Sequence, residues 1–237
     1  MDNAYDVFAE FYDEYIAHSV PLLHRKYLNL TKVILEKFKP RPGRILDATC
    51  GTGILMRLLQ TEGFDVEGMD LSPAMLNKAR EKGLAVHQGD LRHFDLGQGY
   101  DLILCFDSLG HLTTGRDLSA AMQAIGRHLN PGGLFLCDGG TRAKASRMIG
   151  QEFTYDSEPY SFVWRNSRQD DDLIGVEMVI TEKQSGREYL AQYRLRGHDI
   201  EDMVAALEGT GMRVVFATLE PMVKKNGSFV FCCRKEG

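Results

Sequence analysis

Apolar side chains near the start of the chain recur with the spacing of an amphipathic α-helix. They follow the i, i+3, i+4, i+7, i+8 pattern at Phe8, Phe11, Tyr12, Tyr15 and Ile16. Pro21 opens a second helical stretch, which ends before Lys39 because prolines and a glycine follow at residues 40–43. We therefore expect two helices ahead of the first strand.

From residue 44 the pattern changes to short apolar runs separated by helical windows. The runs cover residues 44–48, 66–69, 84–87, 101–105 and 134–137, and the windows cover 54–59, 73–82 and 118–129. Short apolar runs that alternate with helices are typical of a parallel sheet covered on both faces, so the pattern predicts a doubly wound α/β fold. Ligands of such sheets bind at the carboxyl ends of the strands.

The alternation breaks after Thr141. Residues 160–164, 175–181 and 188–195 are predicted antiparallel strands, separated by polar turns at 166–172 and 184–187. The α/β rhythm then resumes with a helical stripe at Ile200, Met203, Val204 and Leu207, followed by strands at 212–219 and 228–233. The sequence thus predicts a seven-stranded, mostly parallel sheet that carries an antiparallel insertion.

Composition narrows the class of protein. The 237 residues correspond to roughly 1.6 domains at about 150 residues each, and 43% hydrophobic residues supply a sizeable core. The net charge of −5 argues against a broad nucleic-acid-binding surface. The first residues lack the positive and apolar regions of a signal peptide, so we expect none, and no apolar run approaches the length of about 20 residues that a membrane helix needs. The five cysteines lack metal-ligand spacing, so we expect reduced thiols, no metal site and a cytoplasmic protein.

A glycine-containing loop joins the first predicted strand to the following helix. It reads Asp-Ala-Thr-Cys-Gly-Thr-Gly over residues 47–53. Glycine lets a backbone approach a ligand closely, and the start of a helix offers unpaired N–H groups. A dinucleotide-binding fingerprint needs a third glycine where Met56 stands, which counts against NAD or FAD.

The next two strands each end in a carboxylate. Asp70 can accept hydrogen bonds from both hydroxyls of a ribose, although it could equally be an acid at the start of a helix. Asp90 can accept a hydrogen bond from the exocyclic amine of adenine. Three consecutive strand ends therefore present a glycine loop and two acids, a pattern that favours a nucleoside ligand over ordinary loop acids.

Five ordered motifs resemble those of class I S-adenosylmethionine-dependent methyltransferases. They occupy residues 47–53, 68–76 (Gly-Met-Asp-Leu-Ser-Pro-Ala-Met-Leu), 89–91 (Gly-Asp-Leu), 106–112 (Phe-Asp-Ser-Leu-Gly-His-Leu) and 129–135 (Leu-Asn-Pro-Gly-Gly-Leu-Phe). The likeness runs from about residue 41 to 142 and more loosely over 197–237. Tyr5-Asp6 and Tyr12-Asp13 also resemble the lid of the small-molecule branch, which includes glycine and sugar-amine N-methyltransferases.

The resemblance implies a Rossmann-like methyltransferase fold in one domain, residues 1–237. Residues 1–40 would form a helical lid, 41–142 and 197–237 the cofactor-binding core, and 143–196 an antiparallel insertion that caps the substrate. The methionine end of S-adenosylmethionine would contact Asp47, Ala48, Thr49, Gly51 and Gly53, and Asp70 the ribose. The remaining contacts would be made by Leu71 and Met75 on the adenine faces, Asp90 and Leu91 at its edge, and Phe106 near the sulfonium. Thr49 departs from the family, which often has glycine there.

The sequence offers weaker indications for the residues that bind the substrate or catalyse the reaction than for those that contact the cofactor. His111 follows the fourth strand at the rim, where a general base would stand, but it could equally cap a helix or pack in the core. Asp107 could bind a substrate ammonium, and Tyr12 could act from the lid. Trp164 could line a substrate pocket or simply cover a sheet face. Arg142 and Arg147 could bind an acidic group or lie in solvent.

Three functions remain open at this point. The first is methyl transfer from S-adenosylmethionine to N or O of a small molecule, with S-adenosylhomocysteine as product. The second is methylation of a tRNA or a protein, which the acidic charge balance disfavours. The third is a module that binds the cofactor without turnover. We expect a small-molecule partner, neither nucleic acid nor membrane, and oligomeric state is left open.

Overall fold

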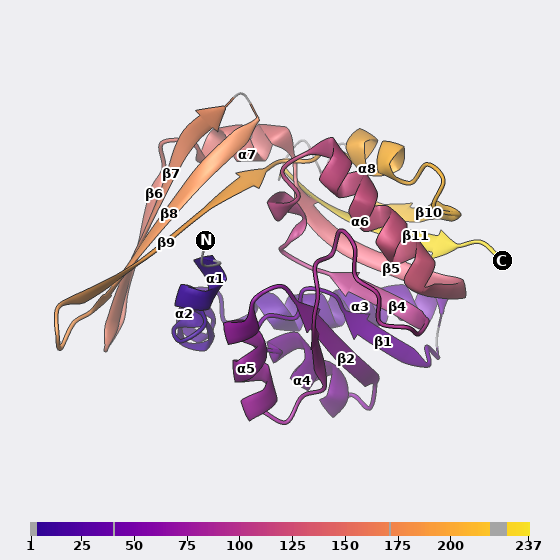
Figure 1. Ribbon diagram of the computed structural model, residues 1–237, viewed down its shortest axis with the longest axis horizontal. Helices are drawn as coiled ribbons and strands as arrows, with labels where there is room; N and C mark the ends of the chain where they lie inside the picture. Colours follow the sequence, from indigo (N-terminus) through magenta and orange to yellow (C-terminus); the bar gives the residue numbers. More distant parts are fainter. Residues whose placement is uncertain (1–3, 40, 171, 219–226) are drawn as a thin grey trace.

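The computed structural model describes residues 4–39, 41–170, 172–218 and 227–237. Seven strands form one sheet in the order β10-β11-β5-β4-β1-β2-β3 (Figure 1). The bounds are β1 Arg44–Asp47, β2 Asp65–Asp70, β3 Val86–Gln88, β4 Tyr100–Cys105, β5 Leu129–Gly140, β10 Met212–Ala217 and β11 Ser228–Lys235. Among the described strands of this sheet, β11 alone runs opposite to the others, pairing antiparallel with both β10 and β5. The predicted seven-stranded, mostly parallel sheet is confirmed. The strand predicted over residues 212–219 corresponds to β10, and its predicted last residue, Leu219, lies outside the described residues.

Helices cover both faces of this sheet. Successive residues of β1 point to opposite faces, so Ile45 and Leu46 belong to two separate hydrophobic clusters. The Ile45 cluster packs against α3 (Leu23–Phe38), α4 (Ile54–Thr61) and α5 (Pro73–Glu81), and the Leu46 cluster against α6 (Gly115–His128) and α8 (Ile200–Ala206). This two-sided burial explains why the strands read as continuous apolar runs.

The first predicted helix is wrong in one respect, because the structure has two short helices there. They are α1 (Ala4–Phe8) and α2 (Tyr12–Ser19), separated by a turn at residues 9–11. Phe11 is buried in this turn, with its ring centroid 4.9 Å from those of Tyr160 and Tyr189. These aromatic contacts with a distant part of the chain outweigh the local helical period.

The antiparallel insertion has four strands rather than the three predicted. They are β6 (Glu152–Asp156), β7 (Tyr160–Asp170), β8 (Leu173–Glu182) and β9 (Arg187–Arg196), in that order across the sheet. The alternating sequence of β6 was a usable signal. The predicted turn at 166–172 was too long, because Asn166 to Asp170 continue β7. A short helix, α7 (Arg142–Met148), was also missed; it precedes the insertion.

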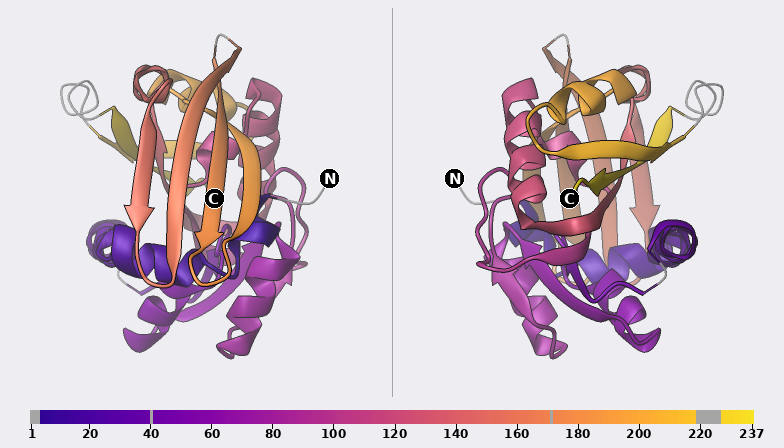
Figure 2. Two further views of the ribbon diagram at one scale, coloured as in Figure 1. Left: turned by 90° about the vertical axis from the view of Figure 1, so that its left-hand side faces the viewer. Right: turned by 90° about the vertical axis from the view of Figure 1, so that its right-hand side faces the viewer.

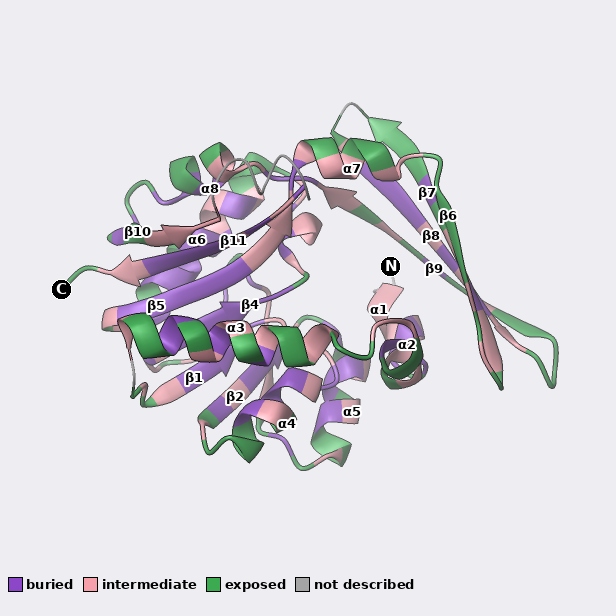
Figure 3. Ribbon diagram, turned by 180° about the vertical axis from the view of Figure 1, so that it is seen from behind, coloured by how far each residue is buried: buried purple, intermediate pink, exposed green. Residues whose placement is uncertain are grey.

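The insertion lies over the N-terminal helices, as the side view in Figure 2 shows. One face of the four-stranded sheet carries Phe162, Met178, Ile180 and Ala191, and it packs on Phe8. Burial is concentrated on this inward face and in the seven-stranded sheet (Figure 3). Thus α1 and α2 lie between the insertion and the carboxyl ends of the core strands.

Across the described parts of the chain, no helix is long and apolar enough to cross a membrane. In the same residues, no cluster of three or more histidine, cysteine, aspartate or glutamate side chains could hold a metal ion.

Candidate active site

A cavity of about 520 Å³ lies where α1, α2 and the insertion face the carboxyl ends of β1, β2 and β4. We call it the main cavity. Most site residues predicted from the sequence line it; Gly53 and the two candidate arginines, Arg142 and Arg147, do not. The predicted residues that line it are Tyr12, Asp47, Ala48, Thr49, Gly51, Asp70, Leu71, Met75, Asp90, Leu91, Phe106, Asp107, His111 and Trp164. The topology therefore brings residues from four of the five ordered motifs, from the N-terminal helices and from the insertion to one place.

Gly53 shapes the loop from behind. It begins α4 in a left-handed conformation with φ +82°, and a Cβ there would lie 2.1 Å from Cδ1 of Leu84. Only glycine fits this combination of backbone and space. Thr49 has an ordinary negative φ, so its departure from the family motif introduces no left-handed strain.

Asp70 braces the glycine loop from the end of β2. One carboxylate oxygen accepts a hydrogen bond from the backbone N–H of Gly51 at 2.8 Å, and the other from that of Ser72 at 2.9 Å. Burial raises the pKa of Asp70, and these hydrogen bonds oppose the shift. Each oxygen keeps a lone pair, so the side chain can still accept hydrogen bonds from a ligand.

Asp47, at the end of β1, is buried, with 3% of its surface exposed. Burial raises the pKa of Asp47 to about 7, although a hydrogen bond from the backbone of Thr49 opposes the shift. A cation beside this carboxylate would favour its charged form. Leu71 is the opposite case, an apolar side chain left in contact with solvent. It is 51% exposed at the rim of the cavity.

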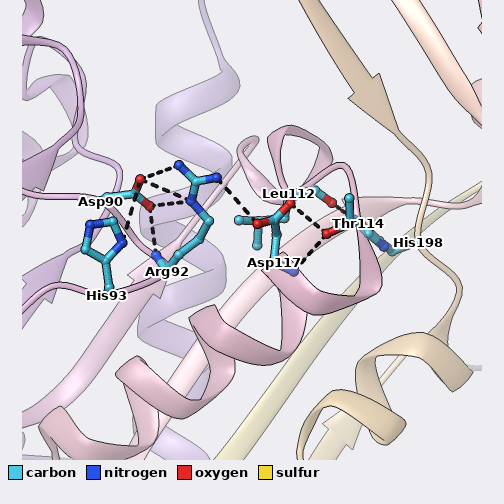
Figure 4. A network of polar contacts seen from close by, with 7 residues as sticks. All are labelled: Asp90, Arg92, His93, Leu112, Thr114, Asp117 and His198. Atoms are coloured by element: carbon cyan, nitrogen blue, oxygen red, sulfur yellow. Dashed lines mark hydrogen bonds and ion pairs between the residues drawn. The ribbon is translucent and has the colours of Figure 1, made fainter.

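Asp90 is held by Arg92 in a two-pronged ion pair (Figure 4). Nε of Arg92 lies 2.9 Å from one carboxylate oxygen, and an Nη lies 2.5 Å from the other. Burial alone would raise the pKa of Asp90, but these hydrogen bonds and the charge of Arg92 hold it below its usual value. Arg92 also reaches Asp117 at 3.4 Å, which ties the loop to α6.

Asp107 has the most unusual backbone of the site. Its φ is +52°, and it is the one described residue other than glycine with a positive φ. Its N–H donates to a carboxylate oxygen of Asp138 at 2.7 Å, which fixes the strained turn. The side chain is exposed to the cavity. The surrounding protein atoms remove water from the carboxylate, and this is the main cause that raises the pKa of Asp107 to about 7. The negative charge of Asp138 also raises this pKa, and the positive charge of Lys144 opposes the shift.

A protein-family model described as a methyltransferase domain matches residues 16–170 of this chain. The putative methyltransferase YqeM of Bacillus subtilis (strain 168) is 34% identical over 178 residues, which is 71% of this chain and 69% of that protein. The chain belongs to the methyltransferase domain family. It is a class I S-adenosylmethionine-dependent methyltransferase, as its motifs predicted.

Two further relatives carry more specific names. The methyltransferase is 33% identical over 133 residues to a dTDP-3-amino-3,6-dideoxy-alpha-D-glucopyranose N,N-dimethyltransferase of Streptomyces fradiae, which covers 55% of this chain and about half, 52%, of that protein. The solved structure of S-adenosylmethionine-bound CalS10, an amino pentose methyltransferase from Micromonospora echinaspora, matches with a TM-score of 0.72. It is 27% identical and covers 90% of this chain and 91% of the other.

In the methyltransferase, His111 lies in an aromatic setting. Its Nε2 is 3.0 Å from the hydroxyl of Tyr5, and its ring centroid is 5.3 Å from those of Tyr5 and Tyr193. Burial lowers the pKa of His111 to about 4, so the ring is neutral near pH 7. Trp164 joins the same wall, because its indole N–H donates to the hydroxyl of Tyr193 at 3.2 Å.

Polar contacts fasten the N-terminal helices to the glycine loop and to α5. Asp6 accepts a hydrogen bond from Oγ of Ser72 at 2.5 Å. Asp13 accepts one from Oγ1 of Thr52 at 2.5 Å and forms an ion pair with Lys82. The Tyr-Asp pairs noticed in the sequence therefore divide their work, with the tyrosines lining the cavity and the aspartates binding the core.

Sequence reasoning missed two partners of this site. Tyr27 of α3 stacks on Phe106 with centroids 4.4 Å apart and rings within 4° of parallel. The Tyr27 hydroxyl donates to Asp138 at 3.2 Å. Asp138 lies near the end of β5, and a carboxylate near a strand end was the signal that singled out Asp70 and Asp90. Tyr27 gave no such signal, because its position on α3 is typical of a core residue.

Proposed function

We propose that this methyltransferase transfers the methyl group to an amine nitrogen of a small molecule. The observation that carries the proposal is Asp107, a carboxylate held by a strained backbone and exposed to the main cavity. Backbone strain that neighbouring groups maintain is typical of functional positions. A carboxylate there can pair with a substrate ammonium and then accept its proton. A neutral hydroxyl acceptor could use the same carboxylate only as a base and would gain no ion pair from it.

The charge of the main cavity supports a cationic acceptor. Of the four aspartates in its described wall, Asp47, Asp70 and Asp90 are those that the motifs assign to the cofactor, which leaves Asp107 for the acceptor. Among the described lining residues, Arg92 is the one arginine or lysine, and Asp90 binds it. Tyrosine, phenylalanine and tryptophan side chains form much of the remaining wall, and their faces attract cations.

The residues also fit the cofactor in the roles that the motifs imply. S-Adenosylmethionine supplies an electrophilic methyl group on a sulfonium. Asp47 and the loop backbone from Ala48 to Gly53 would hold the methionine end, and Asp70 the ribose. Leu71 and Met75 would cover the adenine, with Asp90 and Leu91 at its edge, and Phe106 would lie near the sulfonium. The chain then has to align the acceptor and exclude water.

Proton removal is better suited to Asp107 than to His111. An efficient base has a pKa near the working pH, and the pKa of Asp107 is raised to about 7 while that of His111 is lowered to about 4. Neutral His111, bonded to Tyr5, would instead orient the acceptor together with Tyr12 and Trp164. The amino-sugar acceptors in the names of two relatives suit this chemistry.

The size and cover of the cavity support a small acceptor. The main cavity offers about 520 Å³ for the cofactor and the acceptor together, so the space left beside the cofactor suits a small molecule. The N-terminal helices and the insertion cover it, so a folded tRNA or protein would have to displace them. Methylation of a macromolecule is therefore the weaker proposal.

Selective acylation of a metabolite extract tests the proposed function. Acetic anhydride in mild aqueous buffer blocks amines and largely spares hydroxyls. We expect the enzyme to form S-adenosylhomocysteine with an untreated small-molecule extract and with one exposed to pre-hydrolysed anhydride, and to lose this activity after acylation. Activity that survives acylation, or that appears with purified tRNA and not with the extract, would contradict amine methylation.

Replacing Asp70 with alanine tests the cofactor site. Hydrogen bonds to a charged group contribute about 1.5–3 kcal/mol each, so the affinity for S-adenosylhomocysteine should fall at least about tenfold. Thermal shift should then show little stabilisation by this ligand. Asp65→Ala is the matched control, because Asp65 begins the same strand, β2, and is exposed. Equal loss in both variants would argue against a specific role for Asp70.

A further inference from the structure

A second cavity, of about 190 Å³, adjoins the main cavity. The two share Asp107, Ser108 and Leu195 in their walls. Most of the remaining wall of the second cavity comes from the end of β5, from α7, from β9 and from the start of β11, and residues 109–110 and Ile174 of β8 complete it. Figure 1 shows that α7 stands where the core sheet passes into the insertion. An acceptor whose amine lies at Asp107 can therefore extend past Asp107 into this space.

Lys144 of α7 brings a positive charge to the second cavity, and this charge partly offsets the rise in the pKa of Asp107 and of Asp138 in the same wall. Its ammonium donates to Oγ of Ser228 at 2.8 Å. Within the described parts of the chain, no carboxylate lies within ion-pairing distance of it. An ammonium has three N–H donors, so two remain available. Arg196, the arginine in the described wall of this cavity, binds Asp172, and Arg142 at the start of α7 binds Asp199 and Asp202.

Asp138, the other carboxylate in the described wall of this cavity, already accepts one hydrogen bond on each oxygen. One oxygen of Asp138 accepts the N–H of Asp107 and the other the hydroxyl of Tyr27. These two hydrogen bonds hold the Asp138 carboxylate in place. The charge of the wall therefore changes between the two cavities. Aspartates outnumber the arginine in the described wall of the main cavity, whereas the second cavity ends at Lys144, whose ammonium has spare donors.

We propose that the second cavity is an acceptor subsite in which Lys144 binds an oxyanion, a carboxylate or a phosphate, carried by the molecule whose amine lies at Asp107. The inference rests on the proposed function for the position of the amine. It narrows the acceptor class to amines that also bear an anionic group. A charge-assisted hydrogen bond to Lys144 would give such compounds an advantage of roughly tenfold or more over neutral analogues.

Matched pairs of small probes test this subsite on the full-length enzyme saturated with S-adenosylhomocysteine. The pairs are phosphoethanolamine with ethanolamine, glycine with glycinamide, and glycolate with glycolamide. Calorimetry or ligand-observed NMR gives the affinity of each. We expect the anionic member to bind at least about tenfold more tightly in one or more pairs. The first two pairs distinguish a phosphate site from a carboxylate site.

The variants assign the preference to one side chain. Lys144→Met should reduce it to about twofold or less, and Lys144→Arg should retain part of it. Lys26→Met is the matched control, because Lys26 is exposed on α3, outside both cavities. Thermal shift with S-adenosylhomocysteine checks that each variant is folded.

Two results would overturn the subsite. The first is wild-type enzyme that binds no anionic member more tightly than its neutral partner, including the case in which neither binds. The second is a preference that survives in Lys144→Met. The glycolate pair contains no amine, so it reports on Lys144 even if acylation of the extract has disproved amine methylation. Failure of the subsite and failure of the proposed function are therefore separable.

Discussion

Replacing Asp107 with asparagine is expected to lower the rate of methyl transfer by roughly 100-fold and to change the affinity for S-adenosylmethionine by no more than about twofold. Asparagine has nearly the shape of aspartate and tolerates a positive φ, so the turn at φ +52° should persist. What is lost is the negative charge that binds the acceptor and takes its proton. Steady-state kinetics on an active extract fraction, together with calorimetry for the cofactor, measures both quantities.

Backbone variants separate the charge of Asp107 from its conformation. Asp107→Gly relieves the strained φ, and Asp107→Ala retains the strain with a small side chain. Both should be as inactive as Asp107→Asn if the carboxylate does the work. A near-normal rate in Asp107→Gly would mean that the position serves only the turn.

The pH profile gives an independent readout of Asp107. Because the raised pKa is about 7 and the carboxylate is the active form, wild-type activity should increase with pH through neutrality. This limb should be lost in Asp107→Asn. A limb that persists unchanged belongs to another group.

The core sheet and the cofactor end of the site could be predicted because they follow from short-range patterns. Apolar runs alternating with helices require a parallel sheet, and its strands end at one edge. Residues that directly follow those strands, such as Asp47, Asp70 and Asp90, therefore had to come together. Their positions along the chain were enough to place them.

The acceptor end could not be predicted in the same way. Tyr5 and His111 are 106 residues apart, and Tyr27 and Asp138 are 111 apart. No periodicity links such pairs, because they meet only when the N-terminal helices pack between the core and the insertion. The break between α1 and α2 has the same origin, since aromatic packing on β7 and β9 decides where the helix ends.

A similar limit applies to the electrostatics of the site. The sequence offers Asp107 as a candidate for binding an ammonium, but nothing in it distinguishes Lys144, 37 positions further on. Their chemistry depends on which charges are compensated, and that is a property of the packed structure. Arg142 was the more obvious anion-binding candidate in the sequence, yet Asp199 and Asp202 occupy it.

Replacing Asp47 with asparagine is expected to change stability and cofactor affinity in opposite directions. Burial raises the pKa of Asp47 to about 7, whereas an unfolded aspartate ionises near pH 4. Between these values the unfolded state releases its proton first, so this group destabilises the ligand-free fold progressively as the pH rises from about 4 to 7. At pH 8 the asparagine variant avoids the cost of a buried charge and should be more stable by about 2 kcal/mol, or roughly 4–8 °C in Tm.

The same substitution should weaken binding of S-adenosylmethionine by roughly 100-fold, because the methionine end of the cofactor loses its buried counter-charge. Thermal unfolding at pH 6 and pH 8, with and without the cofactor, measures both effects. The ligand-free advantage of Asp47→Asn should be larger at pH 8 than at pH 6, and stabilisation by the cofactor should nearly disappear. Asp65→Asn, at the exposed start of β2, should match wild type throughout. A ligand-free variant less stable than wild type at pH 8 would show that Asp47 holds the loop together through hydrogen bonds whose loss outweighs the relief of its buried charge. In that case the main role of the Asp47 carboxylate would be to hold the loop in place. Its buried charge would then not be a cost in stability that the fold bears in order to bind the cofactor.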